Sequence, residues 1–560
     1  MKNFVSHLFK CTLGFSLVVV SVVTAVTATA PSVAVAQDAQ KPAVVISLAS
    51  IEQLMGNVGY LTQVAGSPEV GAIITIMSGQ YIEGLNTKQP AGGYVTFAPQ
   101  PSAVVFLPVS DFDMVTTKIE EMVGELEDVG DGVKKLALQR EIFLKEKDGW
   151  IFASDQRANL DNVPADPKLM LEGLYETYDV AIRANVQSVP AELRQMFLSE
   201  IKEGFERTVA SEDDDDKRRA QQEVGGRVIG RIGRFADEAD QLTVGWGTSS
   251  NEGKTFIDFS ATALAGTNLA KEIESAVTIK SEFAGFLVPG AAATVHFTAP
   301  VLKEDVEKTV LMLNAAREKA LEEIDKDDDL PNDEARAAAK DIVGSLMDVL
   351  QQTIEAGKLN GGATLLLEPQ NINFVAGGFI ADGKSVEKDL KRLVKLAKQA
   401  KDNPGVEVKF DAETHGGVSL HTIVVPIPQR EEEARKILGD KMITVVGTGA
   451  KSVYFAFGTD SVELLKQVID GSAAAKGETS PMTVNIALGP ILNFAASIDD
   501  DPVVAGLAEA MKNGQGKDQI AISSKGIPRG IAYRVEVEED VLQLIGQAAK
   551  MRGAQDRDPF

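Results

Sequence analysis

Two histidines six residues apart are the residues whose types and spacing come closest to a metal site. They lie in the segment ETHGGVSLHTIVV as His415 and His421. An even spacing on one strand would place both imidazoles on one face, where they would form half of a metal site. Gly416 and Gly417 favour a different interpretation, in which they form a turn between two strand residues near a sheet edge. Because the chain has no H-E-x-x-H motif and a single cysteine, we adopt that interpretation and predict no metal ligand.

Two acidic segments raise the question of a calcium site. The segment DKDDDLPNDEAR (residues 325–336) begins with alternating aspartates, as a calcium-binding loop does. The match then fails, because Leu330 stands at the glycine position and Arg336 at the position of the bidentate glutamate. We therefore predict a solvated acidic turn at Asp327–Asp329 between two helices, and a second one at Asp213–Asp216. Weak calcium binding by these loops is the alternative.

No segment of the chain carries a recognisable catalytic motif. GTGAKS (Gly447–Ser452) lacks the full pattern of a phosphate-binding loop and is followed by a strand pattern, so it predicts a hairpin turn. The chain has no G-x-S-x-G elbow, and no pair among its 81 carboxylates stands out as a glycosidase pair. We therefore predict no catalytic residue and no cofactor, and we leave cofactor-binding residues unassigned.

One basic segment interrupts an acidic chain. GGRVIGRIGRF (Gly225–Phe235) places Arg227, Arg231 and Arg234 on nearly one stripe of a predicted helix. The chain as a whole carries a formal charge of −25 over 560 residues. A surface of this charge repels nucleic acid and anionic lipid headgroups. We interpret the arginines as balancing the acidic segment beside them, and contact with an acidic partner is the alternative.

The first 36 residues have the pattern of a secretory signal peptide. Lys2 and Lys10 give a positive start, an uncharged apolar run follows at residues 15–28, and residues 34–36 form an A-x-A cleavage signal. We predict cleavage before Gln37, and an uncleaved membrane anchor is the alternative. Cleavage also removes Cys11, the only cysteine, so the mature protein has no disulfide. These features predict export to a bacterial periplasm or to the cell exterior.

The remaining chain repeats one series of element patterns. Five blocks of strand and helix patterns recur in the same order. The first block pairs AVVISLAS and the helix pattern after it with ATVHFTAP and the helix pattern after it. The second block pairs Gly92–Val123 with Ile372–Ala397, and each segment combines strands, an aspartate-containing turn and an amphipathic helix.

The other three blocks extend the repeat to the end of the chain. The third pairs KDGWIFASDQRANLDNV with KSVYFAFGTDSVELLKQVI, which places Trp150 opposite Tyr454 and Leu160 opposite Leu464. The fourth pairs DVAIRANVQSVPAELRQMF with MTVNIALGPILNFAASI, and the fifth pairs two hairpins that each lead into a closing helix. We predict that Trp150 and Trp246 are core residues of their strands. Because chance rarely repeats five blocks in order, we interpret the pattern as an internal duplication.

The duplication predicts two tandem α+β domains after the signal peptide (residues 1–36). The first domain covers residues 37–280 with a helical insertion at about 190–238, and the second covers residues 281–551 with a helical insertion at about 314–358. Residues 552–560 are predicted to be a frayed tail. Strands occur in hairpin-like pairs, such as the two around EPQN within Gly361–Ala381, and do not alternate strictly with helices. This order predicts antiparallel sheets packed against helices.

The signal peptide, the DGWIFAS strand with the short helix after it, and the duplication together resemble a group of exported bacterial proteins. These are planctomycete-type proteins with a signal peptide and duplicated α+β domains. The resemblance implies an exported protein and a duplicated architecture. It brings no functional residues with it.

Three functions follow as expectations. We expect an exported non-enzymatic protein of the cell envelope or the extracellular space that acts as a binding or structural module. Its partner would be an apolar small molecule bound in a cleft or groove, or another envelope protein, and we expect no nucleic acid and no stable transmembrane insertion after cleavage. The alternatives are an exported hydrolase with an unrecognised carboxylate or serine site, and a surface protein that binds calcium weakly.

Overall fold

A computed structural model of the chain describes residues 41–79, 81–97, 100–137, 140–210, 215–326, 332–397, 407–475, 480–498 and 501–555. The predicted signal peptide and its cleavage site lie outside these residues. The acidic turn at Asp327–Asp329, the first two residues of Asp213–Asp216 and the last five residues of the predicted tail also lie outside them. The fold and the candidate site are built from the described residues.

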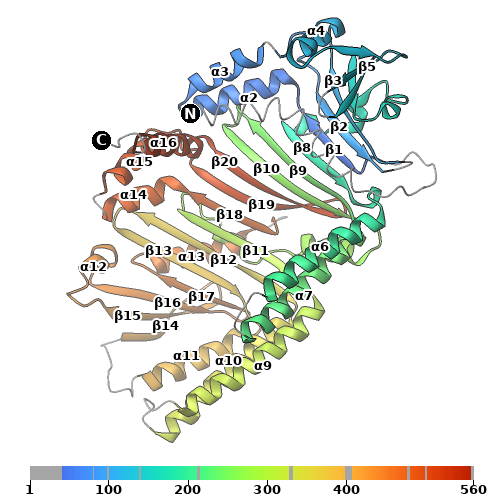
Figure 1. The fold of residues 1–560 in the computed structure, drawn as a ribbon. Coiled ribbons are helices and arrows are strands. Elements are labelled where there is room, and N and C mark those ends of the chain that lie inside the picture. The colour runs from blue at the N-terminus through green and yellow to red at the C-terminus, as the bar shows by residue number, and fades with distance from the viewer. Residues whose placement is uncertain are drawn as a thin grey trace. The chain divides into compact units, whose positions relative to one another are not determined.

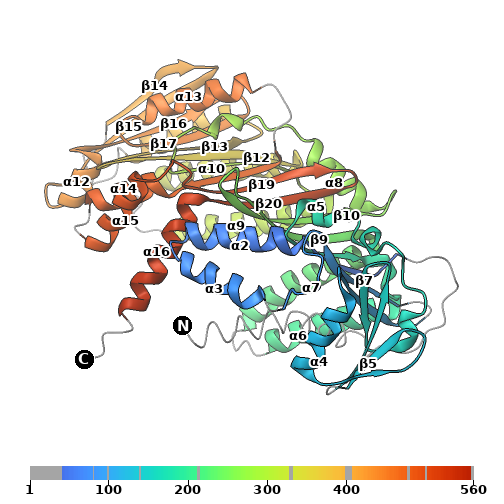
Figure 2. The ribbon, with the colours of Figure 1, turned by 90° about the horizontal axis from the view of Figure 1, so that it is seen from above.

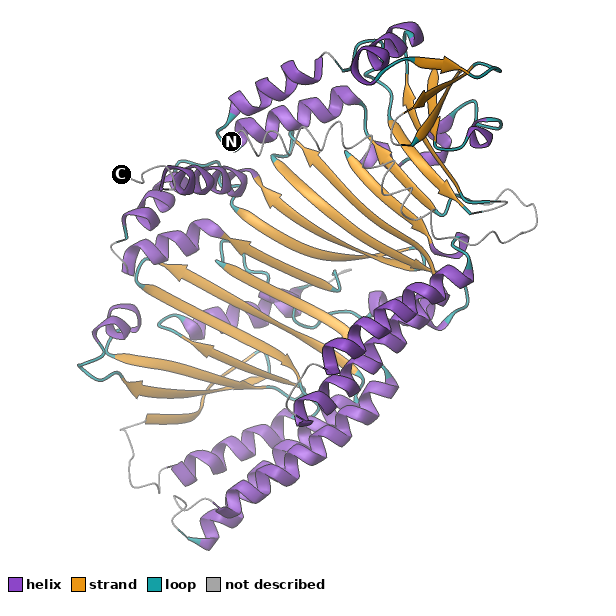
Figure 3. Cartoon of the chain, viewed as in Figure 1, coloured by secondary structure: helices purple, strands orange, loops and turns teal. Residues whose placement is uncertain are grey.

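The chain divides into two compact units. Unit 1 comprises Met1–Ile273, Ile527–Ala532 and Ile545–Phe560, and unit 2 comprises Glu274–Gly526 and Tyr533–Leu544. Each unit combines helices with antiparallel strands, which confirms the predicted α+β class with antiparallel sheets and helices (Figure 3). The predicted first domain ended at residue 280, whereas unit 1 also includes two short segments from the C-terminal end of the chain, Ile527–Ala532 and Ile545–Phe560.

Unit 1 contains ten strands among its described residues (Figure 1). They are β1 (Val44–Leu48), β2 (Ala91–Thr96), β3 (Ser102–Pro108), β4 (Leu126–Asp128), β5 (Val133–Ala137), β6 (Glu141–Lys147), β7 (Trp150–Ser154), β8 (Val180–Asn185), β9 (Ala239–Ser249) and β10 (Lys254–Ala263). Its α-helices are α2 (Ile51–Val64), α3 (Pro68–Gly79), α4 (Phe112–Val123), α5 (Leu174–Thr177), α6 (Ala191–Ala210) and α7 (Asp215–Glu238), and α8 (Asn268–Thr278) crosses into unit 2. The short 3-10 helices are η1 (Arg157–Leu160), η2 (Pro167–Leu171) and η3 (Val186–Ser188).

Unit 2 has a matching set of elements. Its strands are β11 (Ala293–Pro300), β12 (Lys358–Glu368), β13 (Asn371–Phe379), β14 (Glu407–His415), β15 (Val418–Pro426), β16 (Lys441–Thr448), β17 (Ser452–Phe457), β18 (Met482–Ala487), β19 (Gln519–Ile527) and β20 (Gly530–Glu538). Its helices are η4 (Ala284–Phe286), α9 (Lys303–Lys326), α10 (Asp333–Glu355), α11 (Gly383–Ala397), α12 (Glu432–Leu438), α13 (Ser461–Ala474), α14 (Leu488–Ile498), α15 (Pro502–Lys512) and α16 (Glu539–Gln555). The last residue of β19, the first residues of β20 and the second part of α16 belong to unit 1.

The strand pairings of the two units follow one scheme. In unit 1, β1 pairs with β2 and β8, β3 pairs with β2 and β7, and β9 pairs with β8 and β10. The remaining strands of unit 1 form the meander β4–β5–β6–β7. The pairs of unit 2 are the same when ten is added to each strand number. For example, β11 pairs with β12 and β18, and β19 pairs with β18 and β20.

The helix pairs differ in length between the units rather than in number. Between β8 and β9, unit 1 has α6 and α7 with 20 and 24 residues, and unit 2 has α14 and α15 with 11 residues each in the corresponding interval. After the first strand of each unit, unit 2 has the longer pair. There α9 and α10 have 24 and 23 residues, whereas α2 and α3 of unit 1 have 14 and 12. Each segment predicted as a helical insertion thus covers most or all of a long helix pair, and the other unit has a shorter pair in the same interval of its strand order. The members of each long pair lie side by side (Figure 1 and Figure 2).

Alternating side chains build the cores of the units. In unit 2, α13 contributes Leu465 and Val468 to a core that also contains Leu420 of β15 and Val445 of β16. In unit 1, Trp150 is 6% exposed and lies edge-on to Phe106, as predicted for a core residue, but Trp246 is only partly buried. Its indole N–H needs a polar partner, and it donates to the Thr255 hydroxyl at 2.8 Å.

Candidate functional site

The two histidines of the ETHGGVSLHTIVV segment lie on different strands. His415 ends β14 and His421 lies in β15, and Gly416 and Gly417 form the turn between them with φ of 56° and 80°. Positive φ at both positions suits glycine and gives the tight two-residue hairpin turn. His415 Nε2 lies 2.7 Å from Oδ1 of Asp470 on α13, away from the contacts of His421. The alternative of a shared strand face is therefore wrong, and the predicted turn is confirmed.

Alternation along β15 explains why His421 is buried outside the apolar core. Leu420 lies in the core with α13, so its neighbour His421 points to the opposite face of the strand, where α11 covers it. His421 has an exposed fraction of 0%. Ser419 pairs with Thr448 of β16, and His421 pairs with Val446, so the Thr448 side chain is a diagonal neighbour of the imidazole.

An irregularity in β14 brings a backbone N–H to the imidazole. The register between β14 and β15 shifts between Lys409 and Glu413, and Asp411 within this bulge has a φ of 51°. A left-handed conformation at a non-glycine residue is held only where the surroundings fix it. Here the Asp411 N–H donates to His421 Nδ1 at 3.1 Å, and the Phe410 ring lies edge-on to the imidazole at 5.7 Å between centroids.

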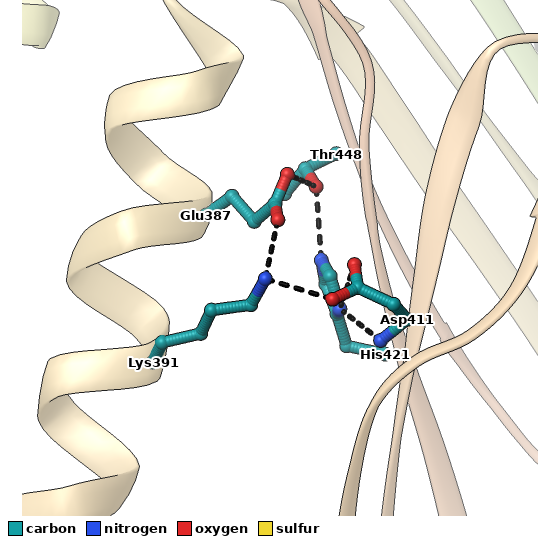
Figure 4. A network of polar contacts seen from close by, with 5 residues as sticks. All are labelled: Glu387, Lys391, Asp411, His421 and Thr448. Carbon is teal, nitrogen blue, oxygen red and sulfur yellow. Dashed lines mark hydrogen bonds and ion pairs between the residues drawn. The ribbon is translucent and has the colours of Figure 1, made fainter.

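These contacts determine which nitrogen of His421 carries the proton. Because a backbone N–H can only donate, Nδ1 must accept, and the proton of the neutral imidazole lies on Nε2. Nε2 then donates to Thr448 Oγ1 at 2.9 Å, and the Thr448 hydroxyl donates to Glu387 Oε2 at 3.4 Å. His421, Thr448 and Glu387 thus form one directed chain of hydrogen bonds (Figure 4).

Helix α11 supplies a lysine that binds two carboxylates. Glu387 and Lys391 are four residues apart and share one face of the helix. Lys391 Nζ lies 2.6 Å from Glu387 Oε1 and 2.8 Å from Asp411 Oδ2 (Figure 4). The start of α11 is fixed by Asp382, whose carboxylate accepts two backbone N–H groups of the first turn. The aspartate turn predicted before this helix is therefore its N-terminal cap.

Burial and the ion pairs shift pKa values in this cluster in different directions. Burial lowers the pKa of His421 below its usual value, although the carboxylates of Glu387 and Asp411 oppose the shift. Hydrogen bonds to Asp411 and then to Glu387 raise the pKa of Lys391, and the bond to Lys391 lowers the pKa of Asp411. These shifts favour the neutral form of the His421 imidazole, the ammonium form of Lys391 and the carboxylate form of Asp411.

The same donor atoms would hold a metal ion only after rearrangement. One atom each from Glu387, Asp411 and His421 lie within 4.8 Å of one another. Both carboxylates already bind the Lys391 ammonium, and Nδ1 of His421 already accepts an N–H. A divalent cation would have to displace the ammonium and free one imidazole nitrogen. The geometry favours a polar cluster whose groups bind one another over a preformed metal centre.

His296 in β11 has different surroundings. Its side chain is completely buried, and neither ring nitrogen has a hydrogen-bond partner among the described residues. Burial lowers the pKa of this imidazole. His296 therefore lies in the interior of unit 2 as a neutral side chain and is not part of the cluster around His421.

Two further segments have the structures that their sequences predict. GTGAKS forms the end of β16, a turn and the start of β17, and the Gly449 N–H donates to the Ser452 carbonyl at 2.9 Å. The basic segment GGRVIGRIGRF lies in α7, where Arg234 Nη1 is 3.4 Å from Glu272 Oε1. The partner is a residue of α8 and not of the acidic segment beside the arginines, part of which lies outside the described residues, so the predicted balance with that segment stays a prediction.

Sequence reasoning missed four of the five residues in the cluster. The spacing of Glu387 and Lys391 was a readable signal for an ion pair on a helix. No local pattern shows that this helix faces β15, or that a bulge turns Asp411 toward it. Thr448 was noticed only as part of a turn segment, because its role depends on a cross-strand neighbour.

No family model, no curated protein and no solved structure matches this chain. Among the helices of the described residues, none is both long enough and apolar enough to cross a membrane. The functional argument therefore rests on the residues of this chain alone.

Proposed function

We propose that the protein is an exported, non-enzymatic binding or structural module of the cell envelope or the extracellular space, built from two copies of one α+β domain. The observation that carries the proposal is the common pairing scheme of the two units, in which β1 to β10 correspond in order to β11 to β20. Duplicated scaffolds of this kind provide extended surfaces for binding or assembly. The signal-peptide pattern of residues 1–36 supports export.

The pairing scheme supports duplication more strongly than a shared element order does. Element order could recur by chance among α+β folds, since strands and helices alternate in few ways. The pairing scheme also includes strands that are far apart in the sequence. In unit 1 the first strand pairs with the eighth, β1 with β8, and in unit 2 β11 pairs with β18 in the same way. The first, fourth and fifth repeated sequence blocks fall on corresponding elements, from the β1 and β11 strands to the closing helices α8 and α16. The second block pairs β2, β3 and α4 with β13 and α11 alone, and the third pairs the short 3-10 helix η1 with the longer helix α13.

The polar cluster supports a non-enzymatic role because its reactive groups bind one another. His421 is fully buried and both of its ring nitrogens have partners, so it offers no free base to a substrate. The ammonium of Lys391 lies between two carboxylates. Such a network stabilises the contact between α11 and the sheet of unit 2.

Native mass spectrometry on the mature chain tests this proposal. The protein, Gln37–Phe560, is purified gently from the envelope fraction of its own host. A discrete added mass that survives mild activation supports a binding module, and a clean multiple of the chain mass supports a structural or assembly role. A monomer without ligand that also turns over a substrate contradicts the proposal.

An exported hydrolase is the second candidate, because the described residues bring a histidine and two carboxylates together at the α11 face. A panel of ester, peptide and glycoside substrates with activity-based probes decides between the two. Turnover or labelling that disappears in the His421→Gln variant supports a hydrolase. No turnover and no labelling on folded protein excludes this candidate.

A further inference from the structure

The outer face of α11 carries a line of lysines. Lys384, Lys388, Lys391 and Lys395 are spaced by four, three and four residues, so they lie along one stripe of the helix. With Glu387 and Arg392 these lysines line a shallow hollow of about 570 Å³. All six side chains belong to α11, so the hollow is the open space between neighbouring side chains on one face of that helix.

Among the described residues, no carboxylate forms an ion pair with the ammonium groups of three of these lysines. Lys384, Lys388 and Lys395 are exposed and make no ion pair with another described residue. Lys391, by contrast, binds two carboxylates, and Arg392 binds those of Asp341 and Asp389. The positive charge of the stripe that no ion pair holds among the described residues thus resides in three exposed lysines, and Lys384 also attracts the nearby carboxylate of Asp382.

This positive charge is unusual in the chain. The whole sequence has a formal charge of −25, yet α11 contains five basic and two acidic residues. The helix at the corresponding place in unit 1, α4, contains one lysine and three acidic residues. The basic face therefore belongs to one copy of the proposed duplication and is not a requirement of the shared fold.

The surroundings of the stripe restrict what can bind. Beside it, α10 exposes the carboxylates of Asp341 and Asp348 with exposed fractions of 73% and 54%. A flat anionic bilayer or a wide duplex would meet these carboxylates together with the lysines. A narrow chain can follow the helix alone. Lys384 and Lys388 lie about one 5.4 Å helical turn apart and Lys388 and Lys395 about two turns apart, spacings similar to those of successive and alternate sugars in a polysaccharide.

From these observations we propose that the basic face of α11 binds a linear anionic polysaccharide with about one carboxylate per sugar. A lysine ammonium group acts as a point charge and lacks the rigid two-pronged donor geometry of an arginine guanidinium. It therefore suits widely spaced carboxylates on a flexible chain. This inference rests on the proposed function, because it names the ligand class of the binding module. It replaces the apolar small molecule expected from the sequence with a charged polymer.

Calorimetric titration of the full mature chain with alginate tests the inference. The test variant is Lys384→Ala/Lys388→Ala/Lys395→Ala. The control variant, Lys303→Ala/Lys308→Ala/Lys319→Ala, removes the same charge from exposed positions of α9 in the same unit. We expect the wild type to bind, the test variant to lose affinity by about tenfold or more, and the control to stay within about twofold. We also expect binding to weaken as salt rises.

Several outcomes would overturn the inference. They are no alginate binding by the wild type at low salt, equal loss in the two triple variants, and equal or tighter binding of neutral dextran, anionic vesicles, single-stranded DNA or poly-glutamate. A failure here leaves the proposed function standing, because mass spectrometry and the substrate panel test that function separately. Hydrolysis of alginate would contradict the non-enzymatic role and not the binding site.

Discussion

His296 and His421 are completely buried in unit 2, and burial lowers the pKa of both imidazoles. They differ in their partners. His421 donates to Thr448 and accepts from a backbone N–H, whereas the ring nitrogens of His296 have no partner among the described residues. A buried polar group without a partner reduces stability, and protonating it reduces stability further. These two side chains therefore determine how unit 2 responds to mild acid.

We predict that unit 2 loses stability as pH falls below about 6.5, the usual pKa of histidine in an unfolded chain. The folded pKa values are lower, so below that pH the unfolded state binds more protons and the free energy of unfolding decreases. Stability is fully present above about pH 6.5. Hydrogen exchange of β11 and β15 in urea, compared at about pH 7.5 and 5.5, measures the effect. The variant His296→Leu should depend less on pH than the wild type does, and identical dependence would contradict the assignment.

A second prediction concerns Lys391, whose removal leaves Glu387 and Asp411 without their shared cation. Because all three side chains are partly exposed, Lys391→Met should lower the free energy of unfolding by only about 1 kcal/mol. Lys388→Met on the same helix is the control and should change it by less than about 0.5 kcal/mol. Both tryptophans lie in unit 1, so their fluorescence would not report on the unfolding of unit 2. Hydrogen exchange in α11 and β15 is therefore the measurement. Equal effects of the two variants would argue against the ion-pair network.

At the scale of elements, the accuracy of the sequence predictions depends on how far apart the interacting residues are. The turns at Gly416–Gly417, at Gly447–Ser452 and before α11 were predicted because their residue types act locally. The bulge at Asp411 and the contact of α11 with β15 were not predicted, because they depend on pairing between distant segments. The long helix pairs were predicted as helical segments, since their apolar spacing is local.

The turn between β14 and β15 gives a prediction at this scale. Gly417 has a φ of 80°, and a Cβ added there would meet no atom within 4 Å. Gly417→Ala should therefore destabilise unit 2 by about 1 kcal/mol through the backbone conformation alone. Gly506 in α15 is equally open but has no positive φ, so Gly506→Ala should stabilise its helix by about 0.5–1 kcal/mol. Thermal unfolding of both variants checks the opposite signs, and two effects of the same sign would be inconsistent with this turn.

At the scale of the whole molecule, the two units share a pairing scheme but carry different residues on it. Every histidine of the described residues lies in unit 2, and both tryptophans lie in unit 1. The corresponding helices α4 and α11 have opposite net charge. Under the proposed duplication, the scaffold has been kept while one copy acquired the buried histidines and the basic face. The candidate sites therefore belong to unit 2 and have no counterpart in unit 1.

Export gives a prediction at the same scale. N-terminal sequencing of the protein from its own host should find Gln37 as the first residue, because residues 34–36 form the cleavage signal. The protein should appear in the periplasmic or culture fraction. A protein that keeps Met1 and stays with the membrane after high-salt washing would instead support the uncleaved anchor.

The central claim is that the protein consists of two copies of one domain, and an experimental structure of the mature chain tests it most directly. Superposing residues 43–263 on residues 292–538 should align β1 to β10 with β11 to β20 in order, with every strand pair preserved. The largest differences should lie in the paired helices that follow the first and eighth strands of each unit. A structure in which β8 and β18 pair with different partners within their units would contradict the duplication and the function built on it.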